Sequence, residues 1–452
     1  MRRPILLLAF ASLFVPAFAA AGIQGQVLPD SSRLERFTLP NGLRVVLRHV
    51  PGCSRIAIAT AFAFGEASDP AGKEGRSALL AELHYLGATQ SAPARTREEM
   101  PSLRPEGWNF GLAPNTTWFE EIAASGQFPI VLQQVADRVR GVAIEASDLA
   151  SARARVADDL AAGYEGNASL SLHRRSGALN RRVADAAVAR YAAGRGLEGL
   201  SLANVRADLA KLFVPANAAL SIAGDLDAYP VRAWVEAQFG SIPAGVPVPA
   251  VPLPATPDTV PRTLTRDDLE HAVGVYAVRA PAITDSLHPE FLVTTLLIGG
   301  QATMSFGPPA APIETRFSYS VLDDPTIVRL YPALDDAAKG PRDVVAGAIM
   351  LFNDFSARAL PGELIQALWR GVDWLLGGPV PPEIMARVRY DMGALHTLCQ
   401  SAALRELSGG EAFWSVYRER FRNATRPDVL RWLRWYRNRT NVAIVIAMPR
   451  GR

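Results

Sequence analysis

The stretch LERFTLPNGLRVVLRHV, residues 34–50, holds two short runs of β-forming residues on either side of Pro40-Asn41-Gly42. Asn-Gly accepts the positive φ angles that a tight turn requires, so this stretch predicts a β-hairpin. The apolar run at 55–65 predicts a third strand. In the next segment, 72–86, three leucines recur at helical spacing and predict a helix with one buried face: Leu79, Leu80 and Leu83.

Strand and helix patterns continue to the middle of the chain. Residues 108–125 alternate as strands do, and 218–224 form an apolar strand after Pro215. Helices are predicted at 129–140, at 147–164, at 202–213 and from Pro230 onward. Residues 244–262 contain six prolines, which exclude a helix interior and a central strand. This segment is predicted to be a semi-rigid, extended linker between two domains.

The second half of the chain repeats the order of strand and helix patterns found in the first half. A strand is predicted near 271–279, a helix at 285–299, β-like segments between 314 and 334, then several helices and a final strand. A helix that runs to Phe213 precedes Asn217-AALSIAGD, and a helix that runs to Tyr436 precedes Asn441-VAIVIAMP. We therefore expect an α+β chain built from a duplicated unit, with domains at 31–243 and 263–452. Two unrelated α+β domains are the alternative.

Composition limits the class of protein. Among 452 residues, 49% are hydrophobic and 20% are charged, which excludes a disordered or collagen-like chain. The formal net charge is +3. It falls to about +1 if Arg2 and Arg3 are removed with a leader, and such a chain offers no excess charge for a polyanion. Nucleic acid is therefore not a predicted partner.

Residues 1–21 predict a cleavable secretory signal peptide, since a basic start precedes an apolar run and a small-residue cleavage site. An uncleaved anchor is the alternative. No later segment reaches 18 apolar residues, so we expect no stable membrane insertion after cleavage. A periplasmic or secreted location, in a Gram-negative bacterium, follows. Cys53 and Cys399 lie in opposite halves; an oxidising compartment allows a bridge, but independent cysteines are favoured.

Three segments carry a resemblance to a known family. They are TLPNGLRVVL (38–47), GRSALLAELHYLG (75–87) and FVPANAALSIAGDLDA (213–228) with FGSIPAG (239–245). In this order and near these spacings they resemble the insulinase/pitrilysin family of zinc peptidases. The resemblance spans nearly the whole mature chain. It implies tandem duplicated α/β-roll domains, of the type also found in mitochondrial processing peptidase, joined by the proline-rich linker.

The resemblance also implies where a zinc site belongs. Active members carry His-x-x-Glu-His on the first helix, where two histidines on one face bind zinc and the glutamate activates a zinc-bound water. Laid on this sequence, those three positions hold Ala78, Ala81 and Glu82, and the distant glutamate ligand falls on or beside Asp159. Alanine offers no donor atom, and two carboxylates do not make the three-ligand site of catalytic zinc. We expect no zinc, no other cofactor and no catalytic residue here.

Two carboxylates facing each other without a metal need compensation. We therefore predict a salt-bridged plug in place of zinc, with Arg155 and Arg76 as the available guanidiniums. His84 cannot share a metal with Glu82, because residues at i and i+2 of a helix point about 200° apart. We interpret His84 as a helix-end residue bonded to a carbonyl or water. The remaining histidines show no metal spacing and are interpreted as ordinary: His49, His173, His271, His288 and His396.

The family's substrate-holding groups are only partly present. Tyr319 matches a tyrosine of an Arg-x6-Tyr pair, but Pro312 stands at the arginine position and Arg316 lies too near. A plain β-sheet tyrosine is the alternative. The family's peptide-binding edge strand aligns with residues 107–111, where Asn109 is retained and Phe110 replaces alanine. Peptide binding by strand addition uses backbone groups, so it can persist without catalysis; a strand without a ligand is the alternative.

The residues therefore indicate a non-catalytic insulinase-like protein, a pseudoenzyme. It would act either as a partner subunit, in a heterodimer with a catalytically intact family member, or as a protein that binds unfolded peptides. An active periplasmic metallopeptidase or other hydrolase with an atypical site, degrading peptides, is the alternative.

Overall fold

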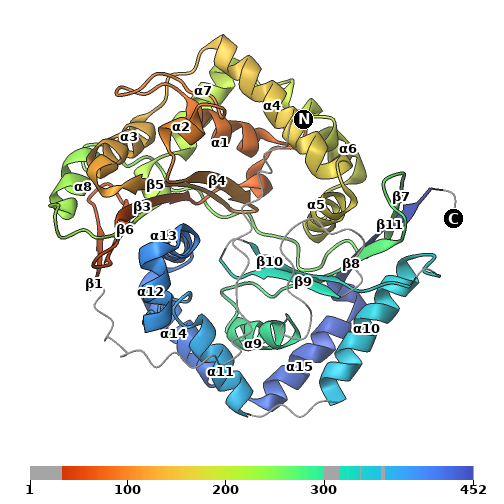
Figure 1. Cartoon of the computed structure of the whole chain (residues 1–452). Helices are drawn as coiled ribbons and strands as arrows, with labels where there is room; N and C mark the ends of the chain where they lie inside the picture. Colours follow the sequence, from red (N-terminus) through yellow and green to blue (C-terminus); the bar gives the residue numbers. More distant parts are fainter. Residues whose placement is uncertain (1–32, 300–314, 323, 336, 358–361, 451–452) are drawn as a thin grey trace.

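The first half of the chain builds a six-stranded mixed sheet, seen at the upper left of Figure 1. In this computed structural model the described residues are 33–299, 315–322, 324–335, 337–357 and 362–450. The strand order is β1-β2-β6-β3-β5-β4; β2 and β6 run parallel, and the other neighbours are antiparallel. The strands are β1 (Arg33–Thr38), β2 (Arg44–His49), β3 (Arg55–Phe62), β4 (Trp108–Ala113), β5 (Thr116–Ala124) and β6 (Ala218–Gly224).

The second half builds a five-stranded sheet with the order β7-β11-β8-β10-β9. Its strands are β7 (Arg262–Arg266), β8 (Val273–Arg279), β9 (Arg316–Ser320), β10 (Asp324–Tyr331) and β11 (Val442–Pro449). Apart from the additional strand β1, both sheets have one order: first strand, last, second, fourth, third. Both also pair the first strand parallel to the last, with the other neighbours antiparallel. The shared topology supports the predicted duplication, and the α+β fold class is confirmed.

Helices surround both sheets. In the first half they are α1 (Arg76–Leu86), α2 (Met100–Leu103), α3 (Phe128–Arg140), α4 (Ala146–Glu165), α5 (Ala168–Asn180), α6 (Asp185–Ala192), α7 (Leu202–Leu212) and α8 (Val231–Phe239). In the second half they are α9 (His288–Gly299), α10 (Pro341–Ala357), α11 (Gly362–Val372), α12 (Pro382–Tyr390), α13 (Met392–Leu407), α14 (Gly410–Arg422) and α15 (Arg426–Arg437). None of the described helices is long and apolar enough to cross a membrane.

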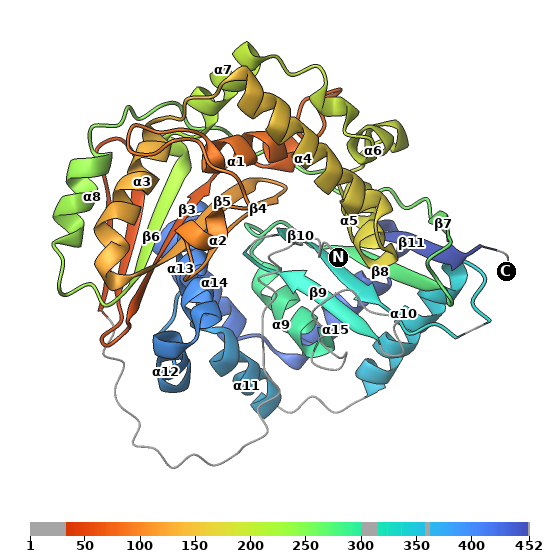
Figure 2. The same ribbon diagram turned by 45° about the horizontal axis from the view of Figure 1, so that its top comes forward.

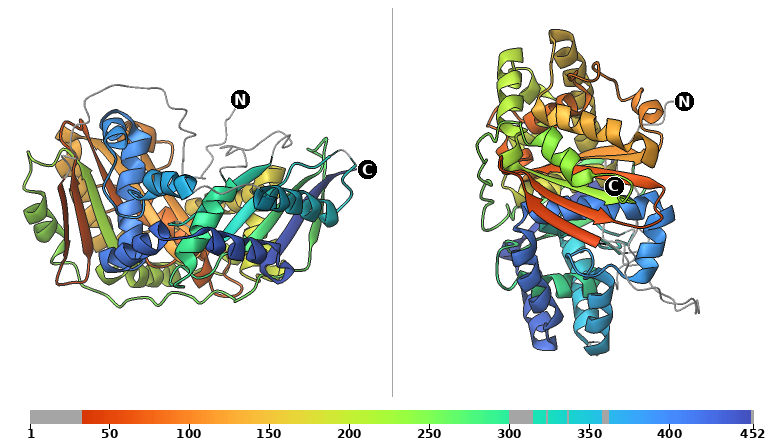
Figure 3. Two further views of the ribbon diagram at one scale, coloured as in Figure 1. Left: turned by 90° about the horizontal axis from the view of Figure 1, so that it is seen from below. Right: turned by 90° about the vertical axis from the view of Figure 1, so that its left-hand side faces the viewer.

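The two halves exchange one helix each. Helix α13, from the second half, packs across β3 and β6 of the first sheet, whereas α5, from the first half, packs across β11 and β8 of the second (Figures 1 and 2). Each helix closes a core cluster that contains residues of both halves. Since both sheets are covered on two faces by this exchange, the halves form one body, seen from below and from the side in Figure 3.

The sequence of strand β3 shows why the first sheet can be covered by helices on both faces. Its residues are buried on both faces, so it reads as a continuous apolar run. Ile56 and Ile58 face the helical layer that contains α1, while Ala57 and Ala59 face α13. The small alanine side chains allow α13 to approach the sheet closely.

Most predicted elements are present, with shifted ends. The hairpin at 34–50 is formed by β1 and β2, and its turn is held because Asn41 Nδ2 donates to the carbonyls of Phe239 and Ile242, at 2.7 and 3.0 Å. The helix predicted at 72–86 begins only at Arg76, because Gly75 has a φ of 92°. Strand β7 was not predicted; it is short, polar and half-exposed, and its first residue falls in the predicted linker.

Several predictions lie outside the described residues. These are the signal peptide at 1–21 and Pro312, which stands at the arginine position of the family's Arg-x6-Tyr pair. Cys53 and Cys399 are both buried in the cluster between α13 and the first sheet, and both are free. Cys399 Sγ donates to the carbonyl of Ser221, at 3.3 Å. The cysteines are therefore independent, as favoured from the sequence.

The exchanged helix gives a test of the fold. Leu398 on α13 is buried against the first sheet. Leu398→Ala is expected to lower the free energy of unfolding by about 2–5 kcal/mol, since it leaves a cavity between the halves. Chemical denaturation followed by tryptophan fluorescence measures this. The control Val416→Ala changes an exposed residue of the neighbouring helix α14 and is expected to have little effect. Equal effects of both variants would contradict the exchange.

Candidate functional site

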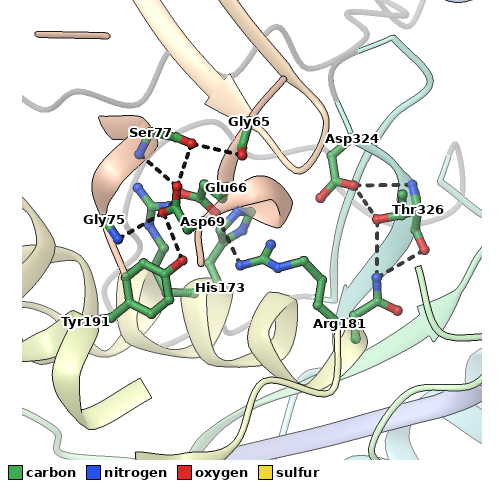
Figure 4. Close-up of polar contacts among 12 residues, drawn as sticks. Gly65, Glu66, Asp69, Gly75, Ser77, His173, Arg181, Tyr191, Asp324 and Thr326 are labelled. Carbon is green, nitrogen blue, oxygen red and sulfur yellow. Dashed lines mark hydrogen bonds and ion pairs between the residues drawn. The ribbon is translucent and has the colours of Figure 1, made fainter. Parts of the chain in front are cut away.

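The loop that precedes α1 fixes where this helix begins. Asp69 Oδ1 accepts hydrogen bonds from the backbone N–H and the hydroxyl of Ser77, at 2.8 and 2.6 Å (Figure 4). Asp69 Oδ2 accepts the N–H of Gly75 at 2.9 Å and the hydroxyl of Tyr191 at 3.3 Å. Burial raises the pKa of Asp69 to about 6, although the hydrogen bonds from Ser77 act to lower it. One buried carboxylate therefore satisfies donors at the first turn of α1.

A second ionic contact ties this loop to α5. Glu66 accepts from Arg174 Nη1 at 2.8 Å and from Arg181 Nη2 at 3.2 Å. At the end of α5, Asn180 Nδ2 donates to Thr326 of β10 in the second sheet. The position of α1 is thus set by contacts that reach both halves of the chain. These residues were not singled out from the sequence, because they lie on separate elements with no shared spacing.

Two of the four predicted degenerate positions, Glu82 and Asp159, meet around one guanidinium. Glu82 of α1 is 1% exposed, and Asp159 of α4 is 39% exposed. Arg97 donates to both carboxylates: Nε and Nη2 lie 2.9 and 2.6 Å from Glu82 Oε2, and Nη1 lies 2.7 Å from Asp159 Oδ2. Arg155 Nε adds a bond of 3.0 Å to Glu82 Oε1. Two carboxylates and two guanidiniums thus form a charge-balanced group, which we call the Arg97 plug.

The plug differs in part from the expectation. Arg155 contributes as predicted, but Arg76 does not: its guanidinium faces Ser68, Asp69 and Asp208. Arg97 supplies the central cation instead, from the loop that follows α1. This contact could not be predicted, because Arg97 belongs to no periodic pattern in the sequence. Burial acts to lower the pKa of Arg97, yet the charges of Glu82 and Asp159 raise it above its usual value.

The donor set here does not fit zinc. Ala81 is fully buried and Ala78 packs at the edge of the core, and neither side chain has an atom that binds metal. Both oxygens of Glu82 accept hydrogen bonds from guanidiniums, so neither is available as a base. Every charge in the plug has a partner of opposite charge within hydrogen-bond distance. The group is thus suited to hold α1 and α4 together rather than to activate water.

His84 occupies a different environment from the one predicted. Its ring stacks on Phe213 with 3.9 Å between centroids and an angle of 4°. His84 lies in the last turn of α1, as predicted, but Phe62 and Phe119 surround its ring, so it packs in the aromatic core instead of facing a carbonyl or water. Burial, followed by the charge of Arg138, lowers the pKa of His84 well below its usual value. The ring is therefore neutral at pH 7.

Within the described part of the chain, one other group brings metal-binding residue types together. His49, Asp225 and Asp227 place ligand atoms within 4.8 Å of one another. However, His49 Nδ1 accepts the N–H of Leu226 at 3.0 Å, so the proton of the neutral ring lies on Nε2, which is 3.2 Å from Asp227 Oδ2. Nδ1 is satisfied without an ion, and a metal on Nε2 would require an imidazolate. We therefore still predict that His49 is an ordinary histidine.

The predicted peptide-binding residues lie on an edge strand. Strand β4 is the last strand of the first sheet. The Gly107 carbonyl accepts the N–H of Ile122 at 2.9 Å, so by antiparallel alternation Trp108, Phe110 and Leu112 direct their backbone groups to the free edge. Asn109 Oδ1 already accepts the N–H of Phe110 at 2.9 Å. A peptide that pairs with this edge must displace the Asn109 side chain from that N–H.

The ring of Phe110 does not project from the edge. It is buried and packs against Tyr85 and Phe119, with centroids at 5.5 and 5.9 Å. The Arg97 guanidinium lies 5.7 Å from its centroid. The Arg97 plug and the edge strand are therefore adjacent.

Tyr319 lies in the core of the second half. Its hydroxyl lies 3.0 Å from His288 Nε2, and His288 Nδ1 lies 2.6 Å from the Tyr417 hydroxyl. Burial, followed by the nearby Tyr417, raises the pKa of Tyr319 well above its usual value. Burial lowers the pKa of His288 to about 3. This environment matches the alternative of a plain β-sheet tyrosine.

Comparisons with known proteins agree with the resemblance. Residues 199–308 match the family model described as the Peptidase M16 inactive domain. No curated protein matches the sequence of the chain.

Solved structures share the fold at low sequence identity. A protease from Helicobacter pylori superposes with a TM-score of 0.71 and 13% identity, covering 92% of this chain and 100% of that one. The periplasmic protease PqqL from Escherichia coli gives 0.65 and 14%, covering 93% of this chain and 48% of that one. A peptidase M16 inactive domain from Pseudomonas fluorescens gives 0.61 and 14%, covering 92% and 98%. This chain thus spans about half the length of PqqL.

The Arg97 plug predicts a stability effect. Arg97→Gln leaves the buried Glu82 with one partner, so the free energy of unfolding is expected to fall by about 3 kcal/mol in denaturant titrations. The double variant Glu82→Ala/Asp159→Ala, which leaves Arg97 without its carboxylates, is expected to be destabilised as well. Arg232→Gln, which removes exposed pairs with Glu35 and Glu236, serves as the control and is expected to leave the stability nearly unchanged. An Arg97→Gln protein as stable as wild type would contradict the plug.

His84 predicts a dependence of stability on pH. The unfolded chain binds a proton at His84 below about pH 6.5, whereas the folded chain does not, so stability falls as the pH drops. Between pH 7.5 and 5.5, His84→Phe is expected to lose about 1.4 kcal/mol less than wild type in denaturant titrations. Asp69 acts in the opposite direction, because its folded-state pKa is raised, but both proteins share it. Parallel losses would show that His84 titrates normally.

Proposed function

We propose that this chain, a homologue of the M16 (insulinase/pitrilysin) peptidases, is a non-catalytic member that binds extended peptides or pairs with a catalytically complete relative. One observation carries this proposal. The Arg97 guanidinium lies between Glu82 and Asp159, at the positions where the family resemblance locates the metal. A cation that belongs to the chain itself satisfies the two carboxylates. No described group at this place is then free to serve as a base or a metal ligand.

Peptide binding is supported by the edge of β4. Three residues direct backbone donors and acceptors outward, and strand addition at such an edge needs no special side chains. The Asn109 amide occupies one of the donors and so limits binding to peptides that replace its bond. This feature also protects the edge from uncontrolled pairing with other strands.

A partner role is supported by length and fold. This chain corresponds to about half of PqqL, and the first half of PqqL superposes alone with a TM-score of 0.59. A chain of this size is therefore suited to pair with a second unit of the same fold. The predicted leader and the periplasmic description of PqqL support a periplasmic or secreted location.

The alternative of an active metallopeptidase or other hydrolase with an atypical site requires a base elsewhere. The Glu82 carboxylate is not that base, since both of its oxygens are bonded to guanidiniums. The neutral, stacked His84 ring is not suited to the task either.

The test compares the natural chain with a restored one. Wild-type protein, purified without chelator or tag and equilibrated with excess zinc, is expected to retain less than about a tenth of an equivalent and to cleave no unfolded peptide. The variant Ala78→His/Ala81→Glu/Glu82→His/Asp159→Glu/Arg97→Ala supplies three ligands, a base and space for the ion. It is expected to bind about one equivalent.

Elemental analysis after gel filtration gives the zinc content, and a quenched fluorescent peptide reports cleavage. One equivalent of zinc in the wild-type protein, or cleavage that a chelator abolishes, would overturn the proposal. Cleavage without zinc would favour the alternative hydrolase.

A further inference from the structure

Two guanidiniums share one carboxylate near the start of β4, and a third acts on them through its charge. Arg104, just before this strand, and Arg138 of α3 both donate to Glu121 of β5. Glu121 lies directly opposite Trp108, the first residue of β4. Arg95, in the loop after α1, is the third guanidinium, and its charge acts on Arg104 and on Tyr85. We call Arg95, Arg104 and Arg138 the arginine cluster.

The arginine cluster carries more positive than negative charge. Glu121 balances one of the three guanidiniums. Among the described residues no carboxylate lies within ion-pair distance of Arg95. Glu99, in the same loop, acts on Arg95 through its charge but forms no ion pair with it; its carboxylate accepts the N–H and the hydroxyl of Thr96, at 2.7 and 3.1 Å. Partly buried guanidiniums without enough carboxylates are unfavourable, and a bound anion would lower the free energy of this site.

Tyr85 adds a polar group to this place. Its ring stacks on Trp108 at 5.7 Å, and the Arg138 guanidinium lies 5.1 Å from the ring centroid. Its hydroxyl is buried and finds no hydrogen-bond partner among the described residues. Burial raises the pKa of Tyr85 to about 12, so the hydroxyl keeps its proton and can donate it. Buried hydroxyls are rarely left unsatisfied, which indicates that an acceptor belongs here.

We propose that the arginine cluster and Tyr85 bind the C-terminal carboxylate of a peptide that pairs with the free edge of β4. The inference rests on the peptide binding proposed above and names the ligand group that this site recognises. Guanidiniums are suited to this group, because their planar donors match the two oxygens of a carboxylate.

Charge also sets the direction of the peptide. A strand antiparallel to β4 ends near Trp108, so its carboxylate meets the arginine cluster. A parallel strand would begin there and would place its N-terminal ammonium among the guanidiniums. Repulsion therefore disfavours the parallel orientation.

The neighbouring Arg97 does not compete for the same anion. It lies beside Phe110, further along β4, and its charge is balanced by Glu82 and Asp159. Arg95 is half-buried, without a carboxylate at ion-pair distance in the described part of the chain. Because Arg97 is paired and Arg95 is not, we expect the peptide carboxylate to bind at the start of β4, near Arg95.

The experiment measures fluorescence anisotropy of an N-terminally labelled, unstructured ten-residue peptide with the full chain. Two forms are compared, one with a free C-terminal carboxylate and one with a C-terminal amide. The wild-type protein is expected to bind the free acid about 10-fold more tightly than the amide. Arg95→Gln is expected to bind both forms alike, at the affinity of wild type for the amide. The control Arg195→Gln, at an exposed arginine remote in sequence, is expected to keep the preference.

A third peptide, amidated but ending in aspartate, separates the two sources of carboxylate. It is expected to bind as weakly as the plain amide, and binding as tight as the free acid would show that a side-chain carboxylate is the ligand. Equal binding of acid and amide by wild-type protein would overturn the proposal while peptide binding itself stands. Failure to bind any of the peptides would overturn both.

Discussion

The guanidinium of Arg97 sets the chemistry of the first half. A carboxylate that is 1% exposed, such as Glu82, must be neutralised by a proton, a metal or a fixed cation. Here the chain supplies the fixed cation, and the same arginine reaches Asp159 on a second helix. Helices α1 and α4 are thereby joined by charge-assisted hydrogen bonds in place of metal coordination. These contacts hold the two helices together, and they leave neither oxygen of Glu82 without a guanidinium partner.

The exchange of α5 and α13 gives this site a fixed frame. Because each helix packs on the sheet of the other half, the position of α1 depends on contacts that run from Asp69 and Glu66 through α5 to the second sheet. An edge strand on such a frame is held in one place, which lowers the conformational entropy lost when a peptide binds. The arginine cluster and the Arg97 plug then lie at successive points along β4, the first with excess positive charge and the second balanced.

Much of the fold could be predicted from the sequence because its signals are local. The Asn-Gly turn, the leucine spacing in α1 and the six prolines of the linker each act within a few residues. Strand β7 was missed because the five residues RTLTR alternate without an apolar face. The duplication was visible from one matched helix–strand pair, whereas the helix exchange was not, since nothing in α13 itself shows which sheet it covers.

The site was less accessible to sequence reasoning. The degenerate positions Ala78, Ala81, Glu82 and Asp159 could be named because a motif fixes their spacing. Arg97 and Arg95 lie in a loop with no periodicity, and the contacts of Arg97 span 15 to 62 residues of chain. The aromatic surroundings of His84 were not predicted, because its stacking partner, Phe213, lies far from it in the sequence. Long-range partners of this kind are set by topology, which spacing alone does not reveal.

The central claim is that Arg97 occupies the place of the metal. A crystal structure of the full chain, grown in the presence of zinc and recorded at the zinc absorption edge, tests it most directly. The account predicts side-chain density for Arg97 between Glu82 and Asp159, with no anomalous peak there. An anomalous peak bound by these two carboxylates, with Arg97 turned away, would contradict it.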